Sequence, residues 1–137
     1  MKTDAKHYGL PIYEVDGEEY AVGTEEQAEN AVKLAIVDSI WAFKPEFLTT
    51  FLRRHMPHVR RFPAKDLEKA LRVAQEKLSE DAAALIWALV GTLIDTFEQA
   101  VVAADGRGHF LSPYDGKERR SDTVPGLPEG RVAYRLN

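Results

Sequence analysis

Basic side chains are concentrated in the nine-residue segment RRHMPHVRR, at positions 53–61. Its charged and titratable members are Arg53, Arg54, His55, His58, Arg60 and Arg61, and Pro57 interrupts it. Guanidinium groups bind carboxylates and phosphates through paired hydrogen bonds, and histidines add positive charge below about pH 6.5. The segment is therefore a candidate contact for a partner macromolecule or for nucleic acid. The alternative is a solvated connection between two helices that is neutralised by acidic residues elsewhere in the chain.

A second candidate surface is acidic and lies near the start of the chain. It consists of Glu14, Asp16, Glu18 and Glu19 in the sequence IYEVDGEEYAV. Closely spaced carboxylates could imitate a phosphate backbone and bind a basic protein surface. They could equally form a solvated face that keeps an edge strand from aggregating, or pair with the arginine segment.

The third candidate is the segment DGRGHFLSPYDG, which offers Asp105, Arg107, His109, Tyr114 and Asp115 around several turns. An aspartate and a histidine can bind a metal or transfer protons. However, no third ligand follows at a diagnostic spacing, so we predict neither a metal site nor a cofactor. The alternative is that these residues stabilise turns and the end of a helix.

Composition limits the classes of protein to which the chain can belong. It has 137 residues, 45% of them hydrophobic, which is enough for one domain over residues 1–137 with its own core. The absence of cysteine excludes disulfide scaffolds, Cys-type zinc sites and cysteine nucleophiles. The sequence begins with a polar stretch, and its longest nearly apolar run, residues 82–94, is shorter than the roughly 20 residues needed to cross a bilayer. We therefore expect a cytoplasmic protein that does not contact a membrane.

Charge is distributed unevenly along the chain, although the net charge is only −4. Residues 1–30 carry two basic and eight acidic side chains, whereas residues 31–62 carry six basic and two acidic ones. Such asymmetry indicates either charged partners or internal pairing between segments.

Local signals predict a β-hairpin followed by helices. Asp16-Gly17 separates two β-prone runs over residues 12–22 and is a favoured hairpin turn. Thr24 and Gln27 have the spacing of a capping box, which predicts a helix over residues 25–43. The apolar arc of this helix is wide and predicts contacts on two sides, with Trp41 buried.

Three further helices are expected. A short helix follows Pro45 and stops before Pro57, and periodic leucines predict a helix over 65–78. Ser79 has the character of an N-cap for a helix over 80–104, in which Ile86, Trp87 and Leu89 would be core residues. Gly91 within that helix indicates close packing by a neighbour.

Two β elements are expected near the other end of the chain. A short strand is expected over 109–111, and the alternation in residues 131–136 predicts a closing strand with one buried face. The expected fold class is α+β, in which terminal β-hairpins form a small antiparallel sheet packed on about four helices.

The stretches EVDGEEYAVGTEEQAENA, DGRGHFLSPYDGKE and the ending AYRLN resemble small uncharacterised accessory proteins encoded by bacteriophages and prophages. Many of these end in a comparable Tyr-Arg-x-Asn strand. The resemblance implies a protein that binds a host component and inhibits or redirects it.

We therefore expect a non-catalytic interaction protein that binds a host macromolecule, most simply a protein, through charged surface patches. One alternative is a nucleic-acid-associated protein that uses the arginine segment. Another is a small enzyme that uses the loop at residues 105–115.

Overall fold

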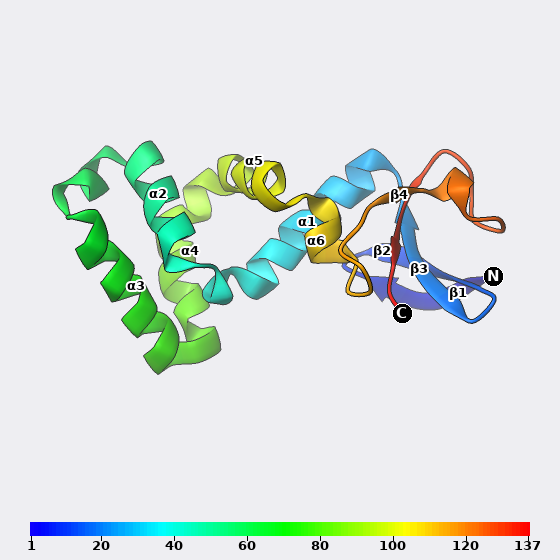
Figure 1. Ribbon diagram of the computed structural model, residues 1–137, viewed down its shortest axis with the longest axis horizontal. Coiled ribbons are helices and arrows are strands. Elements are labelled where there is room, and N and C mark those ends of the chain that lie inside the picture. Colours follow the sequence, from blue (N-terminus) through cyan, green and yellow to red (C-terminus); the bar gives the residue numbers. More distant parts are fainter. The chain divides into compact units, whose positions relative to one another are not determined.

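The computed structural model describes all residues from 1 to 137 and shows the expected α+β class. The chain divides into two compact units, one formed by Met1–Ile36 with Glu98–Asn137 and the other by Val37–Phe97. Figure 1 shows the strands in the first unit and the helices α2, α3 and α4 in the second.

A five-stranded antiparallel sheet of order β1-β2-β3-β5-β4 forms the centre of the first unit. Its strands are β1 (Lys2–His7), β2 (Leu10–Val15), β3 (Glu18–Gly23), β4 (Arg119–Arg120) and β5 (Val132–Arg135). The hairpin predicted at Asp16-Gly17 is confirmed, with φ angles of 51° and 82°. Only residues that tolerate positive φ suit such a turn, so the local sequence determines it.

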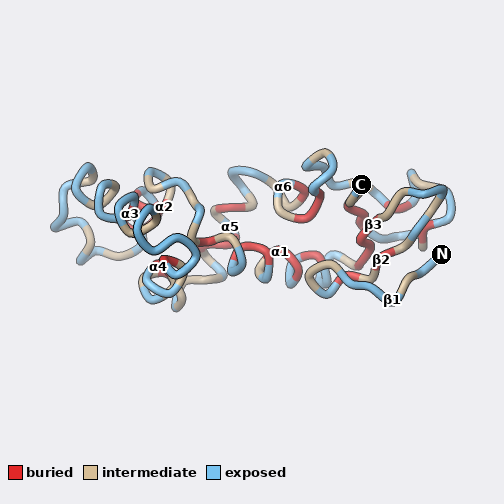
Figure 2. The backbone as a smooth tube through the Cα atoms, turned by 90° about the horizontal axis from the view of Figure 1, so that it is seen from below, coloured by how far each residue is buried: buried red, intermediate tan, exposed pale blue.

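Helices of the first unit bury their apolar residues with the sheet. They are the first part of α1 (Glu25–Ser39), the second part of α5 (Ile94–Asp105) and the short α6 (Arg107–Leu111). The capping box is present, because the Thr24 amide donates to Gln27 Oε1 at 2.9 Å and the Gln27 amide to Thr24 Oγ1 at 3.2 Å. Figure 2 shows buried residues along α1 and β3.

The second unit is helical. Its elements are the 3-10 turn η1 (Ile40–Ala42), α2 (Pro45–His55), the 3-10 turn η2 (Pro57–Arg61), α3 (Ala64–Leu78), η3 (Ser79–Asp81), α4 (Ala82–Val90) and η4 (Gly91–Leu93). An aromatic cluster lies in its core, where the Phe97 ring is 4.9 Å from that of Phe51, 5.5 Å from Phe43 and 6.0 Å from Phe47, between centroids. Such tilted and edge-on pairs stabilise beyond the burial of area alone.

The helix expected over 80–104 is instead divided by a 3-10 turn at Gly91–Leu93. Ser79 does not act as an N-cap, because its φ is 49° and its side chain makes no capping hydrogen bond. Gly91 is not closely packed either, since an added Cβ would meet only Trp87, its own neighbour one turn earlier, at 3.7 Å. Leu89 is half-buried and not a deep core residue.

Burial along the first predicted helix is narrower than expected. Leu34 and Val37 are exposed, so the helix buries one side and not two. Both tryptophans, Trp41 and Trp87, are half-buried. The pattern of apolar residues predicts more buried side chains here than the structure has. The second unit does not provide enough contacts to cover all of them.

The closing strand expected over 131–136 is confirmed as β5, but two other expectations about strands were wrong and one strand was missed. Residues 109–111 belong to helix α6, in which Gly108 and Leu111 are buried at helical spacing. Strand β5 is buried on both faces, because Ala133 as well as Tyr134 is inaccessible. Strand β1 was not predicted at all.

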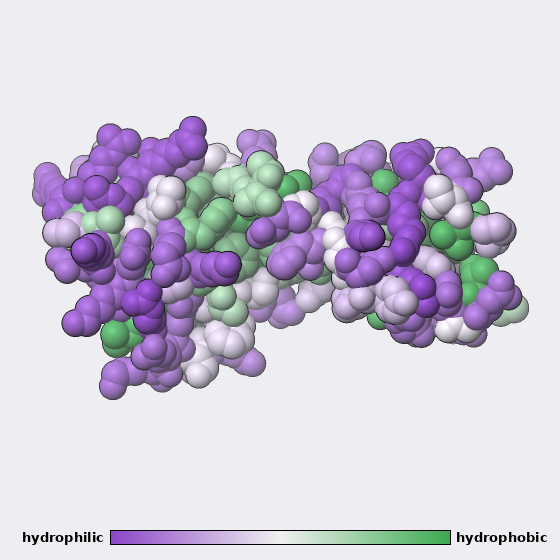
Figure 3. All heavy atoms as spheres, viewed as in Figure 1, coloured by the Kyte–Doolittle hydropathy of each residue, from purple (hydrophilic) through white to green (hydrophobic).

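The helical stretch over residues 64–105 contains one window that is long and apolar enough to cross a membrane by length and composition alone. Only 22% of that window is buried, and Leu85 in α4 is 47% exposed. In Figure 3 hydrophobic residues gather over α5, with hydrophilic ones around them. The expectation of a cytoplasmic protein without membrane contact stays a prediction.

Candidate functional site

The arginine segment spans the last turn of α2, the residue Met56 and the 3-10 turn η2. Pro57 ends the helix because its ring cannot continue it, and the chain then turns toward α3. In Figure 3 hydrophilic residues dominate the corner at which α2 leads into α3. All six predicted residues therefore lie within one short stretch of the second unit.

Two of the four arginines stabilise this turn. Arg53 Nη1 donates a hydrogen bond to the Phe62 carbonyl oxygen. Arg60 Nε donates to the Arg53 carbonyl oxygen at 2.7 Å, and its Nη2 donates to that of Arg54 at 3.4 Å. These carbonyls include the unpaired acceptors at the C-terminal end of a helix, where a cation is favourable. Arg53 and Arg60 thus connect η2 to the end of α2.

The other two arginines remain free. The side chains of Arg54 and Arg61 are exposed and form no hydrogen bond or ion pair. His55 and His58 are exposed as well, and the ring of His55 also packs against Phe51 with 4.5 Å between centroids. Arg54 and Arg61 are therefore the arginines of this segment without an intramolecular partner, whereas Arg53 and Arg60 keep their charge because their acceptors are neutral carbonyls.

Phe62 directly follows this segment and was missed by the sequence analysis. Its side chain is 58% exposed, although phenylalanine is normally buried. We call Arg54, His58, Arg61 and Phe62 the basic surface. An aromatic residue next to the arginines was visible in the sequence, but its exposure was not.

The acidic hairpin retains only part of its charge for a partner. Glu18 accepts a hydrogen bond from the Tyr20 hydroxyl at 2.6 Å and pairs with Arg135 at 3.0 Å. Glu14 and Asp16 are exposed, and Asp16 lies in the hairpin turn. Glu19 is half-buried, and its backbone amide donates to Asn137 Oδ1 at 2.6 Å. The carboxylate of Glu18 thus pairs within the protein, whereas those of Glu14 and Asp16 face solvent.

Arg107 is the centre of a polar network in the first unit. Its Nε and Nη2 donate to the two carboxylate oxygens of Glu118 at 2.8 and 2.9 Å, and Nη2 lies 2.7 Å from Glu25 Oε2. The Tyr134 hydroxyl also donates to Glu118. The position of α6 depends on a close approach, since a Cβ on Gly108 would lie 2.5 Å from the Lys117 carbonyl carbon. Glu118 and Tyr134 were not predicted as members.

Protonation in this network is fixed at neutral pH. Burial raises the pKa of Tyr134, and the neighbouring Glu118 raises it further. Burial alone would lower the pKa of Arg107, but its bonds to Glu118 and Glu25 outweigh this and raise it. The network therefore provides a permanent hydrogen-bond donor and a permanent cation, neither of which exchanges a proton near neutral pH.

Asp115 and Tyr114 lie beside β5 in a second polar group. The Ser112 hydroxyl donates to Asp115 Oδ1 at 2.9 Å, and Arg119 pairs with Oδ2 at 2.5 Å. Burial would raise the pKa of Asp115, but the hydrogen bonds from Ser112, Lys117 and Arg119 lower it on balance. The Arg135 guanidinium lies 3.8 Å above the centre of the Tyr114 ring, a cation–π contact.

The remaining loop candidates do not join these networks. Asp105 and His109 are exposed, and His109 contacts only the neighbouring ring of Phe110. No group of three or more potential metal ligands occurs in the structure. The loop thus supplies ion pairs that hold α6 and β5, as the structural alternative predicted for Arg107 and Asp115.

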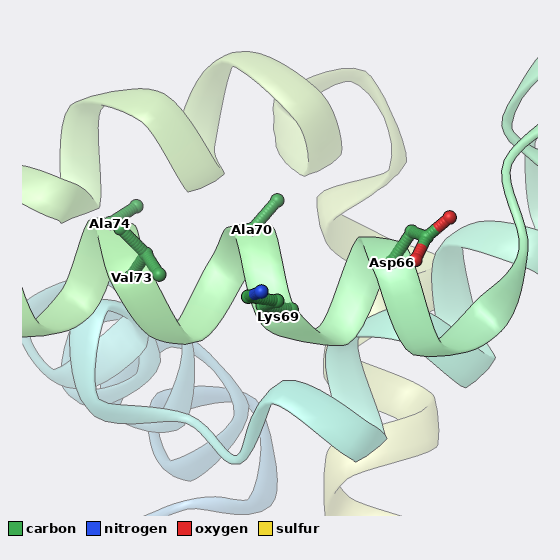
Figure 4. Close-up of a pocket in the computed structure, with 5 residues that line it drawn as sticks. All are labelled: Asp66, Lys69, Ala70, Val73 and Ala74. Carbon is green, nitrogen blue, oxygen red and sulfur yellow. The ribbon is translucent and has the colours of Figure 1, made fainter.

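A shallow groove of about 480 Å³ lies along α3 in the second unit and is lined by Asp66, Lys69, Ala70, Val73 and Ala74. Figure 4 shows the two alanines on one side of this helix, with Lys69 and Val73 on another. The lining residues include no hydroxyl, amide or imidazole group, so the groove offers little specific recognition.

Comparison with known proteins finds no matching family model, no similar curated protein and no similar solved structure. The site itself is therefore the basis for inferring the function of this protein.

Proposed function

We propose that this protein is a non-catalytic interaction protein that binds a host macromolecule through its basic surface. The observation that supports this proposal is that the four arginines of the segment fall into two pairs with different contacts. Arg53 and Arg60 fix the turn, whereas Arg54 and Arg61 are exposed without an intramolecular partner. Because the backbone of the turn is already fixed, binding has to order only the side chains of Arg54 and Arg61.

The resemblance of the terminal motifs to phage-encoded accessory proteins supports the same proposal. Proteins of that kind act by inhibiting or redirecting a host component. The acidic hairpin, through Glu14 and Asp16, is a second charged patch that could contribute to the contact.

Binding to nucleic acid is the second candidate function. No acidic residue occurs from Arg53 to Lys65, so a phosphate backbone would meet no repulsion within this stretch. The small enzyme that uses Asp105, Arg107, His109, Tyr114 and Asp115 stays a prediction, and no contact in the loop specifically favours it.

Affinity capture from a bacterial lysate, with and without nuclease, tests the proposal. The wild-type chain is compared with the double variant Arg54→Ala/Arg61→Ala. The matched control is Arg72→Ala/Arg120→Ala, which removes the same two charges from exposed ion pairs. We expect a captured partner to be retained by the control, lost by the first variant and unaffected by nuclease.

Two results would contradict this proposal. Loss of the partner on nuclease treatment would favour nucleic acid. Equal capture by both double variants would show that the basic surface is not the binding site.

A further inference from the structure

We propose that the basic surface binds an acidic protein segment that also provides an apolar contact for Phe62. This inference rests on the proposed function and specifies the chemistry of the partner. It assigns Phe62 as the anchor of the contact, with Arg54 and Arg61, which both precede it in the sequence, as its charged partners.

Phe62 is held in place by its backbone while its ring stays in solvent. Its amide donates to the Val59 carbonyl oxygen at 3.0 Å, and its own carbonyl accepts from Arg53. Pro63 follows it and restricts the backbone further, immediately before α3. An aromatic side chain on a fixed backbone has only two side-chain torsions to order on binding, as is typical of interface anchors.

Charge complementarity indicates an acidic partner. Arg54 and Arg61 are exposed and unpaired, and the stretch from Arg53 to Lys65 contains no carboxylate. A basic partner would be repelled there, and a purely apolar one would leave two guanidinium groups beside the interface without a counter-charge.

The number of cations favours a protein over nucleic acid. The stretch from Arg53 to Lys65 carries five cationic side chains, whereas duplex-binding proteins commonly contact about six to ten phosphates. By contrast, a protein interface commonly depends on a few aromatic and arginine residues.

Fluorescence anisotropy with three defined probes tests the inference on the full chain. The probes are a polyglutamate peptide with leucine at every third or fourth position, a plain polyglutamate peptide of the same length, and an oligothymidylate of equal charge. The variants are Phe62→Ala, Phe62→Trp and Arg54→Ala/Arg61→Ala, with Arg72→Ala/Arg120→Ala as the charge-matched control.

We expect the glutamate-leucine peptide to bind most tightly. Phe62→Ala should weaken its binding about tenfold or more, as for an anchor residue, and Phe62→Trp should retain it. The same Phe62→Ala change should alter the affinity for plain polyglutamate by less than about twofold, because only Coulomb attraction acts there. The double arginine variant should lose both peptides, and the control should lose neither. Thermal unfolding confirms that each variant is folded.

Other outcomes overturn the inference in distinguishable ways. If plain polyglutamate binds as tightly and Phe62→Ala has no effect, the anchor role is wrong while binding through the arginines stands. If the oligothymidylate binds most tightly in a Phe62-dependent manner, the partner is nucleic acid. If no probe binds, the inference fails, and the lysate experiment judges the proposed function separately. If the glutamate-leucine peptide still binds to the Arg54→Ala/Arg61→Ala variant, both this inference and the proposed function are wrong.

Discussion

Single residues decide which charges of this protein face solvent. Arg53 and Arg54 are adjacent in the sequence, yet the side chain of the first donates to a backbone carbonyl and that of the second makes no polar contact. The sequence could not show which arginines are free. The acceptors of Arg53 and Arg60 are main-chain carbonyls, and the residue types do not indicate where these carbonyls lie. Replacing all four arginines together would therefore mix a loss of stability with a loss of binding.

His7 provides a prediction about pH. Its Nε2 lies 3.1 Å from the Leu111 carbonyl oxygen, and burial lowers its pKa despite this hydrogen bond. The folded state therefore binds fewer protons than the unfolded state below the ordinary value near 6.5. The free energy of unfolding should fall as pH decreases through that value toward the lowered pKa, with no further loss from His7 below it.

Denaturant unfolding between about pH 7.5 and pH 5.5 measures this effect. The variant His7→Gln keeps a hydrogen-bond donor but does not titrate, so its stability should depend less on pH than that of the wild type. Identical pH dependence in both proteins would show that His7 does not contribute.

At the scale of elements, the sequence predicted those whose signals are local. Asp16-Gly17, the Thr24–Gln27 capping box and the prolines at positions 45 and 57 each define a boundary within a few residues, and the structure confirms all of them. Strand β1 was missed because its pattern is mostly exposed and lacks apolar alternation. It exists because it pairs with β2, and pairing between strands is not encoded in one segment alone.

Helix α4 shows how far composition can mislead about burial. Ile86 is 1% exposed, whereas Leu89, which the sequence also predicts as a core residue, is half-buried. Both lie in a helix that is apolar on every side, so periodicity cannot identify the packed face. The contacts made by the rest of the second unit select that face.

This difference gives a prediction about stability. Ile86→Ala should cost about 2–5 kcal/mol because a cavity remains in the core, and Leu89→Ala should cost less. Thr24→Ala should cost about 1 kcal/mol, the usual effect of losing one N-cap. Chemical denaturation of the three variants measures the order. A larger loss for Leu89→Ala than for Ile86→Ala would mean that another surface covers Leu89 in solution.

For the molecule as a whole, burial is distributed unevenly among elements. Strands β3 and β5 contain Tyr20, Ala21, Val22, Val132, Ala133 and Tyr134, all of which are at most 4% exposed. Helix α3 has 15 residues, of which only Leu71 is buried, while Val73 and Leu78 are 39% and 45% exposed. Local opening requires little free energy where few apolar contacts must break.

Hydrogen exchange followed by mass spectrometry should therefore show α3 exchanging first and β3 with β5 last. The paired strands lie inside the sheet with partners on both sides, so their amides exchange only when the sheet opens. Protection of α3 equal to that of β3 would contradict this order and would mean that another surface covers its exposed apolar residues. Repeating the exchange at several protein concentrations identifies that surface as a second copy of the chain if the protection grows with concentration, because association follows mass action.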